Sequence, residues 1–98
     1  MNYLDVVQGD LLEFDMLVTQ GRKAFEPQEG DRYFFRVENG GPNIVQTEGH
    51  FRIPKIELPV GEYSFSGGIL FADGTVRTVF RPDDSRVRVY RQVGEDGS

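Results

Sequence analysis

The stretch GEYSFSGGILFADGTVRTVF, from Gly61 to Phe80, decides the fold class because its pattern is that of a β-hairpin. Apolar side chains recur at every second position, which is the period of a strand with one buried face. Asp73-Gly74 is a favoured pair for a two-residue type I′ turn. Gly67 and Gly68 interrupt the alternation and predict a bulge or a close backbone approach. The stretch therefore predicts two antiparallel strands joined by a tight turn.

The same alternation continues toward both ends of the chain, and no segment keeps the apolar period of a helix for long enough to form one. It leaves Leu17 and Phe34 on the outer faces of their strands. The aromatic residues expected in the core are Phe14, Phe35, Tyr63, Phe65 and Phe71.

About seven short strands, spaced about 8 to 12 residues apart, indicate an all-β protein. We expect an immunoglobulin-like antiparallel β-sandwich, and a closed Greek-key barrel remains an alternative because strand spacing does not fix connectivity. Residues 1–93 would form a single domain, followed by a polar tail over residues 94–98.

Composition narrows the classes of function. The chain of 98 residues suits one domain with one core, and it has no cysteine for a disulfide or a thiolate ligand. The N-terminal residues lack the basic and apolar regions of a secretory leader, and no apolar run approaches the length of a membrane helix. We therefore expect a protein without a membrane span.

Charge is distributed unevenly along the chain. The formal net charge is −5, and residues 1–49 hold four basic and nine acidic side chains, whereas residues 50–98 hold seven of each. The acidic total argues against nucleic-acid binding, which needs an excess of Lys and Arg on one face. Basic residues gather near the C-terminal end, at Arg77, Arg81, Arg86, Arg88 and Arg91.

The sequence offers little catalytic chemistry. His50 is the single histidine, and alternation places it outward beside Phe51, so we interpret it as structural or merely exposed. Glu13 and Asp15 lie two apart on a strand and are interpreted as a solvated face. The chain alone cannot supply the ligand set of a zinc site, and it has no nucleotide-binding glycine motif. We predict no enzyme activity, no catalytic residue, no cofactor and no metal.

The last strand offers a candidate protein interface. Val87 and Val89 should face the core, which places Arg86, Arg88 and Tyr90 together on the opposite face. Arg and Tyr are enriched at protein interfaces, and the exposed Phe34 would extend the candidate surface. In the competing interpretation, Asp5 or Asp10 on the first strand neutralises the arginines within the fold.

The chain resembles the immunoglobulin-like domain of tailed-phage proteins, notably the N-terminal domain of baseplate upper proteins. The run LPVGEYSFSGGILFADGTVRTVFRPDDSRVRVYRQV, residues 58–93, is similar to the closing half of that domain. The shared positions are Leu58, Pro59, Gly61, Tyr63, Asp73, Gly74, Val76 and Thr78. VVQGDLLEFDMLVTQGRKAF, residues 6–25, is similar to its Gly-Asp start and first alternating strand.

The resemblance implies a structural or adaptor protein of a tailed-phage virion, located in the tail, baseplate or capsid and in the host cytoplasm during assembly. Its partners would be other virion proteins, bound in a symmetric multi-copy assembly in which many weak contacts add up. The alternative is a small acidic host-directed inhibitor that occupies a basic groove. Its signature is the acidic N-terminal half, led by Asp5, Asp10, Glu13 and Asp15.

Overall fold

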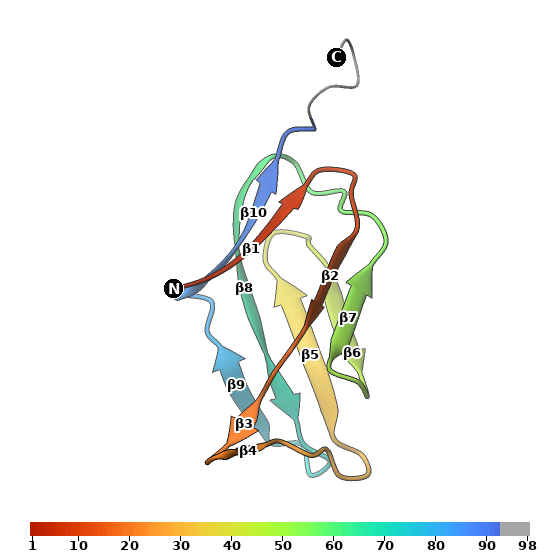
Figure 1. Ribbon diagram of the computed structural model, residues 1–98, viewed down its shortest axis with the longest axis vertical. Coiled ribbons are helices and arrows are strands. Elements are labelled where there is room, and N and C mark those ends of the chain that lie inside the picture. Colours follow the sequence, from red (N-terminus) through yellow and green to blue (C-terminus); the bar gives the residue numbers. More distant parts are fainter. Residues whose placement is uncertain (93–98) are drawn as a thin grey trace.

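The protein is all-β over residues 1–92, the part that its computed structural model describes (Figure 1). These residues form ten strands and no helix: β1 (Asn2–Val7), β2 (Leu12–Asp15), β3 (Thr19–Gln20), β4 (Lys23–Ala24), β5 (Arg32–Val37), β6 (Asn43–Gln46), β7 (His50–Ile53), β8 (Gly61–Leu70), β9 (Val76–Phe80) and β10 (Ser85–Tyr90). The predicted tail, residues 94–98, lies outside the described residues.

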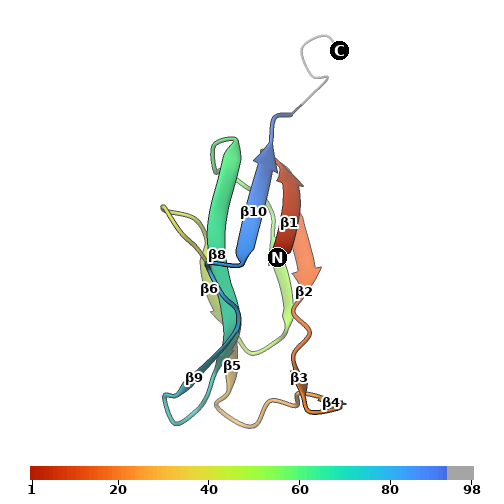
Figure 2. The ribbon, with the colours of Figure 1, turned by 90° about the vertical axis from the view of Figure 1, so that its left-hand side faces the viewer.

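The strands form one large sheet and two small ones. The six-stranded sheet has the order β1-β10-β8-β5-β6, with β9 also paired to β8. β2 pairs with β7, and β3 pairs with β4. Figure 2 shows β2 on one side of the molecule and β5, β6 and β8 on the other, so that the small β2–β7 sheet faces the large one. Side chains from both layers fill the space between them.

One strand pair departs from the antiparallel arrangement that the sequence predicts. β1 and β10 are parallel, with Asp5 opposite Arg88, whereas the other paired strands are antiparallel. Strands that follow one another through a short turn must be antiparallel. β1 and β10 are the first and last strands, so no turn constrains their relative direction, and local pattern could not reveal it.

The strand count also differs from the expected seven. Residues 19–24 form an additional small two-stranded ribbon, β3–β4. The return strand β9 and the last strand β10 are separate, as expected, and they pair with different halves of the ten-residue β8. A turn at the start of β10, closed by the Asp84 N–H bond to the Arg81 carbonyl, separates them.

The core lies between the two facing sheets. Phe35, Phe51, Ile69 and Val87 are fully buried there. Of the five aromatic residues predicted for the core, Phe35 and Phe65 are buried, and the other three are half-buried and pack against it: Phe14, Tyr63 and Phe71. The Phe35 ring lies 4.9 Å from that of Phe14 and 5.4 Å from that of Phe65. Facing strands are therefore joined by a continuous group of aromatic rings.

The two glycines inside β8 act as predicted. The register between β8 and β9 shifts between Gly67 and Gly68, which is a bulge. A Cβ atom added to Gly68 would lie 2.0 Å from the Arg77 carbonyl oxygen. The site thus combines a bulge with a backbone approach too close for any side chain.

The hairpin turn is not of the predicted type. Gly74 has a φ of 93°, but Asp73 does not have the positive φ that a type I′ turn requires. The Gly74 N–H donates to the Phe71 carbonyl, and the Phe71 N–H donates to the Thr75 carbonyl. The loop therefore has three residues, with glycine in the left-handed position of a G1 bulge. The Asp73 carboxylate accepts bonds from the Thr75 hydroxyl and N–H, and these bonds lower the pKa of Asp73.

Phe34 is buried, so the prediction that it is exposed is wrong. Its side chain is only 7% exposed, although Leu17, the other residue placed outward, is 80% exposed. Phe34 lies on the inner strand β5, opposite Gly68 on one side and Val45 on the other. Neighbouring strands cover an outward ring in such a position, and glycine leaves room for it. Alternation indicates to which face of the sheet a side chain points, but it does not indicate whether neighbouring residues bury that side chain.

Candidate protein-interaction surface

The outer face of β10 and β1 carries the residues that the sequence selected. Val87 and Val89 are buried, and Arg86, Arg88 and Tyr90 alternate with them on the other face of the sheet. The parallel β1 places Tyr3 opposite Arg86 and Asp5 opposite Arg88. We call the outward side chains of Tyr3, Asp5, Arg86, Arg88 and Tyr90 the β1–β10 surface.

Arg88 is held on two sides by β1. Its Nε lies 2.6 Å from Asp5 Oδ1 and its Nη2 lies 2.9 Å from Asp5 Oδ2, a bidentate pair. Its guanidinium carbon lies 4.0 Å from the centre of the Tyr3 ring, which is a cation–π contact. The hydrogen bond to Arg88 is the main reason why the pKa of Asp5 is lowered, and the same bond raises the pKa of Arg88. These contacts fix the side chains in one arrangement.

Arg86 is engaged with backbone rather than with an acid. Its Nη1 donates to the carbonyl oxygens of Pro82, at 2.7 Å, and Ser85, at 3.0 Å. The competing interpretation thus holds for Arg88, which Asp5 neutralises, whereas Asp10 forms no salt bridge within residues 1–92. Less free charge is available on this face than the sequence suggests.

The β1–β10 surface includes two exposed aromatic side chains. Tyr3 and Tyr90 are each 46% exposed, and the Tyr90 hydroxyl lies 3.5 Å from Asp5 Oδ1. The sequence prediction missed Tyr3, although Tyr3 and Asp5 share one parity along β1 and could have been placed together. The arrangement can offer a partner two tyrosine rings around a charged pair.

Phe34 is not part of this surface. β8 separates its strand, β5, from β10 in the sheet order. Phe34 instead lines a small hollow with Arg36, Val45, Leu70 and Val76. The structure therefore brings together three of the four residues selected from the sequence and leaves the fourth elsewhere.

His50 forms a separate cluster on the β2–β7 sheet. Its Nδ1 lies 2.6 Å from Asp15 Oδ1, and its Nε2 lies 2.7 Å from Glu13 Oε2. The bonds to Asp15 and then to Glu13 raise the pKa of His50. Each ring nitrogen is already taken by one carboxylate, and no hydroxyl contacts the ring within the described chain, so the cluster lacks a nucleophile to activate.

The cluster also does not form a metal site. The two carboxylates bind opposite sides of the imidazole ring, so their oxygens do not converge with a ring nitrogen on one point. Residues 1–92 contain no group of three His, Cys, Asp or Glu side chains that could hold a metal ion.

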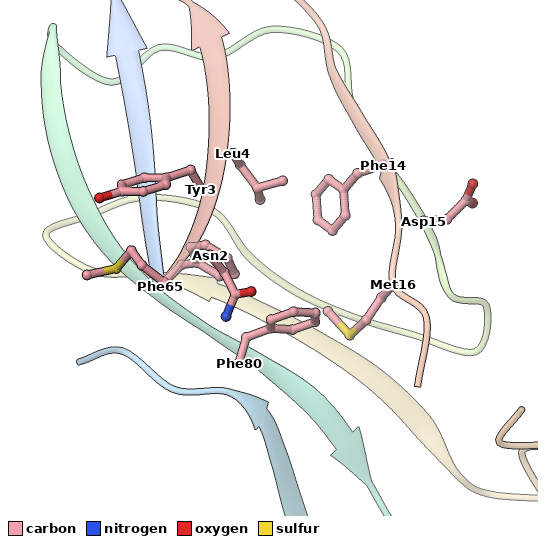
Figure 3. A pocket seen from close by; sticks show the side chains of 9 residues that line it. Asn2, Tyr3, Leu4, Phe14, Asp15, Met16, Phe65 and Phe80 are labelled. Carbon is pink, nitrogen blue, oxygen red and sulfur yellow. The ribbon is translucent and has the colours of Figure 1, made fainter. Parts of the chain in front are cut away.

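A cavity of about 280 Å³ opens between β1, β2 and the β8–β9 strands (Figure 3). Its walls are mainly apolar: Leu4, Phe14, Met16, Phe65 and Phe80, with Met1, Asn2, Tyr3 and Asp15 at its margins. Figure 3 shows the Asp15 carboxylate pointing away from the other labelled side chains. The cavity thus suits an apolar group.

Comparison with protein-family models, curated proteins and solved structures finds no match to this chain. Within the described residues, no helix has the length and apolar character needed to cross a membrane.

Proposed function

We propose that the protein is a non-enzymatic adaptor of a tailed-phage virion, built on an immunoglobulin-like sandwich, that docks on partner subunits through its β1–β10 surface. The observation that carries the docking proposal is the fixed arrangement of Tyr3, Arg88, Asp5 and Tyr90 on one sheet face. Tyr and Arg are the residue types that dominate binding energy at interfaces. Because their geometry is set before binding, little side-chain entropy is lost on docking.

Strand order supports the immunoglobulin-like assignment. In that fold one sheet contains the third, sixth and seventh strands, and the other sheet contains the second and fifth strands together with the first and fourth. The large sheet has the order β10-β8-β5-β6, and the sheet that faces it contains the pair β2–β7, which agrees with this plan. β1 lying against β10 is the adjacency of first and last strands that we expect from such a topology.

Two details of the core point the same way. The Tyr63 hydroxyl donates to the Pro59 carbonyl at 2.6 Å, at the start of β8, which is the position and bond of a tyrosine corner. The second cysteine of antibody domains follows that tyrosine by two residues, and here the position is Phe65. In antibody domains strands B, C and F contribute a disulfide and a tryptophan to the core, and under the proposed assignment the packed rings of Phe14, Phe35 and Phe65 would take their place.

The virion assignment is supported by the resemblance of residues 58–93 and 6–25 to phage immunoglobulin-like domains. The cluster at His50 also suits a binding module, because among the described residues it has no nucleophile to activate. Its partners would be virion subunits, bound in multiple copies so that weak contacts add up.

Mass spectrometry of purified particles tests whether the protein is part of the virion. We expect the protein at a fixed copy number per particle. Recovery only from infected cytosol, together with capture of a single host protein, would reject the virion adaptor in favour of the acidic inhibitor.

Surface variants test the docking face. Charge reversal of Arg88 alone would place two carboxylates together, so double variants are more informative. One replaces both tyrosines, Tyr3→Ser and Tyr90→Ser. The other exchanges the charged pair, Asp5→Arg and Arg88→Asp. Both should fold and fail to enter particles. Leu17→Ser, at an 80% exposed position outside this surface, is the matched control and should be incorporated normally. Normal incorporation of the tyrosine variant would show that partners bind elsewhere.

A further inference from the structure

β2 has hydrogen-bond partners on only one side. The Met16 N–H donates to the Gly49 carbonyl, and the β2–β7 register then directs the backbone groups of Leu12 and Phe14 toward β7 as well. In an antiparallel pair alternate residues point to opposite sides, so the N–H and C=O groups of Glu13 and Asp15 face away from β7. No backbone partner is found for them within residues 1–92.

The open edge of β2 borders the apolar cavity. Phe14, Asp15 and Met16 line one side, and Asn2, Tyr3 and Leu4 of β1 line another (Figure 3). Phe14 and Phe80 are only half-buried although they pack against the core. A strand placed beside β2 would therefore extend the small sheet and direct every second side chain into this space.

The outer face of β2 is acidic. Glu13 and Asp15 are exposed there, whereas the cationic residues of this face, His50 and Arg52, lie on β7, on the far side of β2 from its open edge. A residue on an added strand would lie about 5 Å, Cβ to Cβ, from the residue opposite it. Lys or Arg at those positions would form favourable cross-strand pairs, and acidic residues would be repelled.

We propose that β2 is a strand-addition site for an extended segment of a partner protein that alternates apolar and basic residues. The added strand pairs with the backbone of Glu13 and Asp15, its apolar side chains fill the cavity beside Phe14 and Phe80, and its basic side chains face the two carboxylates. Recognition of this kind takes its affinity from main-chain bonds and its specificity from alternate side chains. Tyr3 belongs both to the cavity lining and to the β1–β10 surface, but the main-chain pairing at Glu13 and Asp15 uses no outward side chain of β10, so amide protection there can be measured separately from docking.

Titration of ¹⁵N-labelled protein with the peptide acetyl-Lys-Val-Arg-Phe-Lys-Val-amide tests the site. We expect saturable binding and slower amide hydrogen exchange at Glu13 and Asp15, with little change at Phe14, whose N–H already bonds to β7. This alternation of protection distinguishes strand addition from general attraction of a cationic peptide to an acidic protein. A dissociation constant above about 1 mM would overturn the proposal.

Three matched peptides separate the contributions. Replacing the basic residues by Glu should weaken binding by about two- to fivefold or more for each charge pair. Reordering the same residues as Lys-Lys-Arg-Val-Phe-Val should abolish the alternating protection. N-methylation of the peptide amides that face β2 should abolish binding, and retained binding would show that no strand is added.

Protein variants complete the test. Glu13→Pro removes an N–H that points away from β7 and should block the peptide, whereas Glu13→Gln keeps the edge and should weaken binding only about two- to fivefold. Protection of Tyr3 and Asp5 in place of Glu13 and Asp15 would move the site to β1 and overturn the proposal. Concentration-dependent dimerisation that gives the same protection without peptide would identify a second copy as the occupant and also overturn it.

Discussion

Replacing Gly68 by alanine is the sharpest test of the central hairpin. The added Cβ would lie 2.0 Å from the Arg77 carbonyl oxygen and 3.0 Å from the Val79 nitrogen, so it meets backbone rather than a movable side chain. Real Cβ atoms almost never come closer than 3.0 Å to a neighbour. β9 must therefore move by about 1 Å or more, and its bonds to β8 around Thr78 must stretch or break.

The expected cost follows from three contributions. Forcing an extra carbon into a packed site costs about 1 to 3 kcal/mol. Losing one ladder hydrogen bond adds about 0.5 to 1.5 kcal/mol. Alanine restricts the unfolded chain and returns about 0.4 to 1 kcal/mol. These ranges combine to about 0.5 to 4 kcal/mol, and their midpoints predict that Gly68→Ala lowers the free energy of unfolding by about 2 kcal/mol, a large share of a small domain's stability.

Urea unfolding measures this loss, which corresponds to a midpoint lower by about 1 to 2 M. Gly74→Ala is the matched control, because no atom lies within 4 Å of its Cβ position and only its φ of 93° opposes the substitution. The control should lose about 1 to 2 kcal/mol, with NMR shifts confined to the loop. A Gly68→Ala variant as stable as the parent would refute the close β8–β9 approach.

Three further outcomes can be checked. Tyr63→Phe removes the donor to the Pro59 carbonyl and should lower the free energy of unfolding by about 1 kcal/mol; an unchanged urea midpoint would show that the bond contributes nothing. Phe35→Ala empties a fully buried position and should cost about 3 to 5 kcal/mol, and near-native stability in thermal unfolding would place the core elsewhere. An NMR titration of His50 should give a pKa above the ordinary value of about 6.5, and Asp15→Asn should lower that pKa. Because folding raises the pKa of His50, its bonds stabilise the fold fully below the ordinary pKa, and this stabilisation disappears as pH rises through the pKa of the folded protein. An equal His50 pKa in the parent and in Asp15→Asn would show that the bond to Asp15 does not raise it.

The strands and most inward positions could be predicted because a half-buried strand repeats every two residues. Phe35, Phe65 and Val87 were placed correctly on this basis. The hairpin loop was not, since Asp-Gly occurs both in type I′ turns and in loops with a G1 bulge. In the structure the Asp73 carboxylate accepts two local bonds from Thr75, which accompany the three-residue loop.

Pairings between distant strands lay outside what local pattern can report. The parallel contact of β1 with β10 joins residues more than 80 positions apart, and the Arg88–Asp5 bond depends on it. By sequence alone Asp5 and Asp10 are equally available to the arginines, and only the register selects Asp5. Parity could place Tyr3 beside Asp5, but the contact of its ring with Arg88, 4.0 Å away, depends on the same register.

The fold also decides which outward residues remain available to a partner. On β5, outward Phe34 is covered because strands flank it on both sides. On β1, outward Tyr3 is 46% exposed because β10 pairs with only one side of that strand. The exposure of these two rings thus follows the strands that pair beside them; Tyr90, also 46% exposed, lies on β10 beyond the residues that pair with β8. Surfaces near unpaired edges, at β1 and at β2, are therefore where this protein can offer both ordered side chains and free backbone groups to a partner.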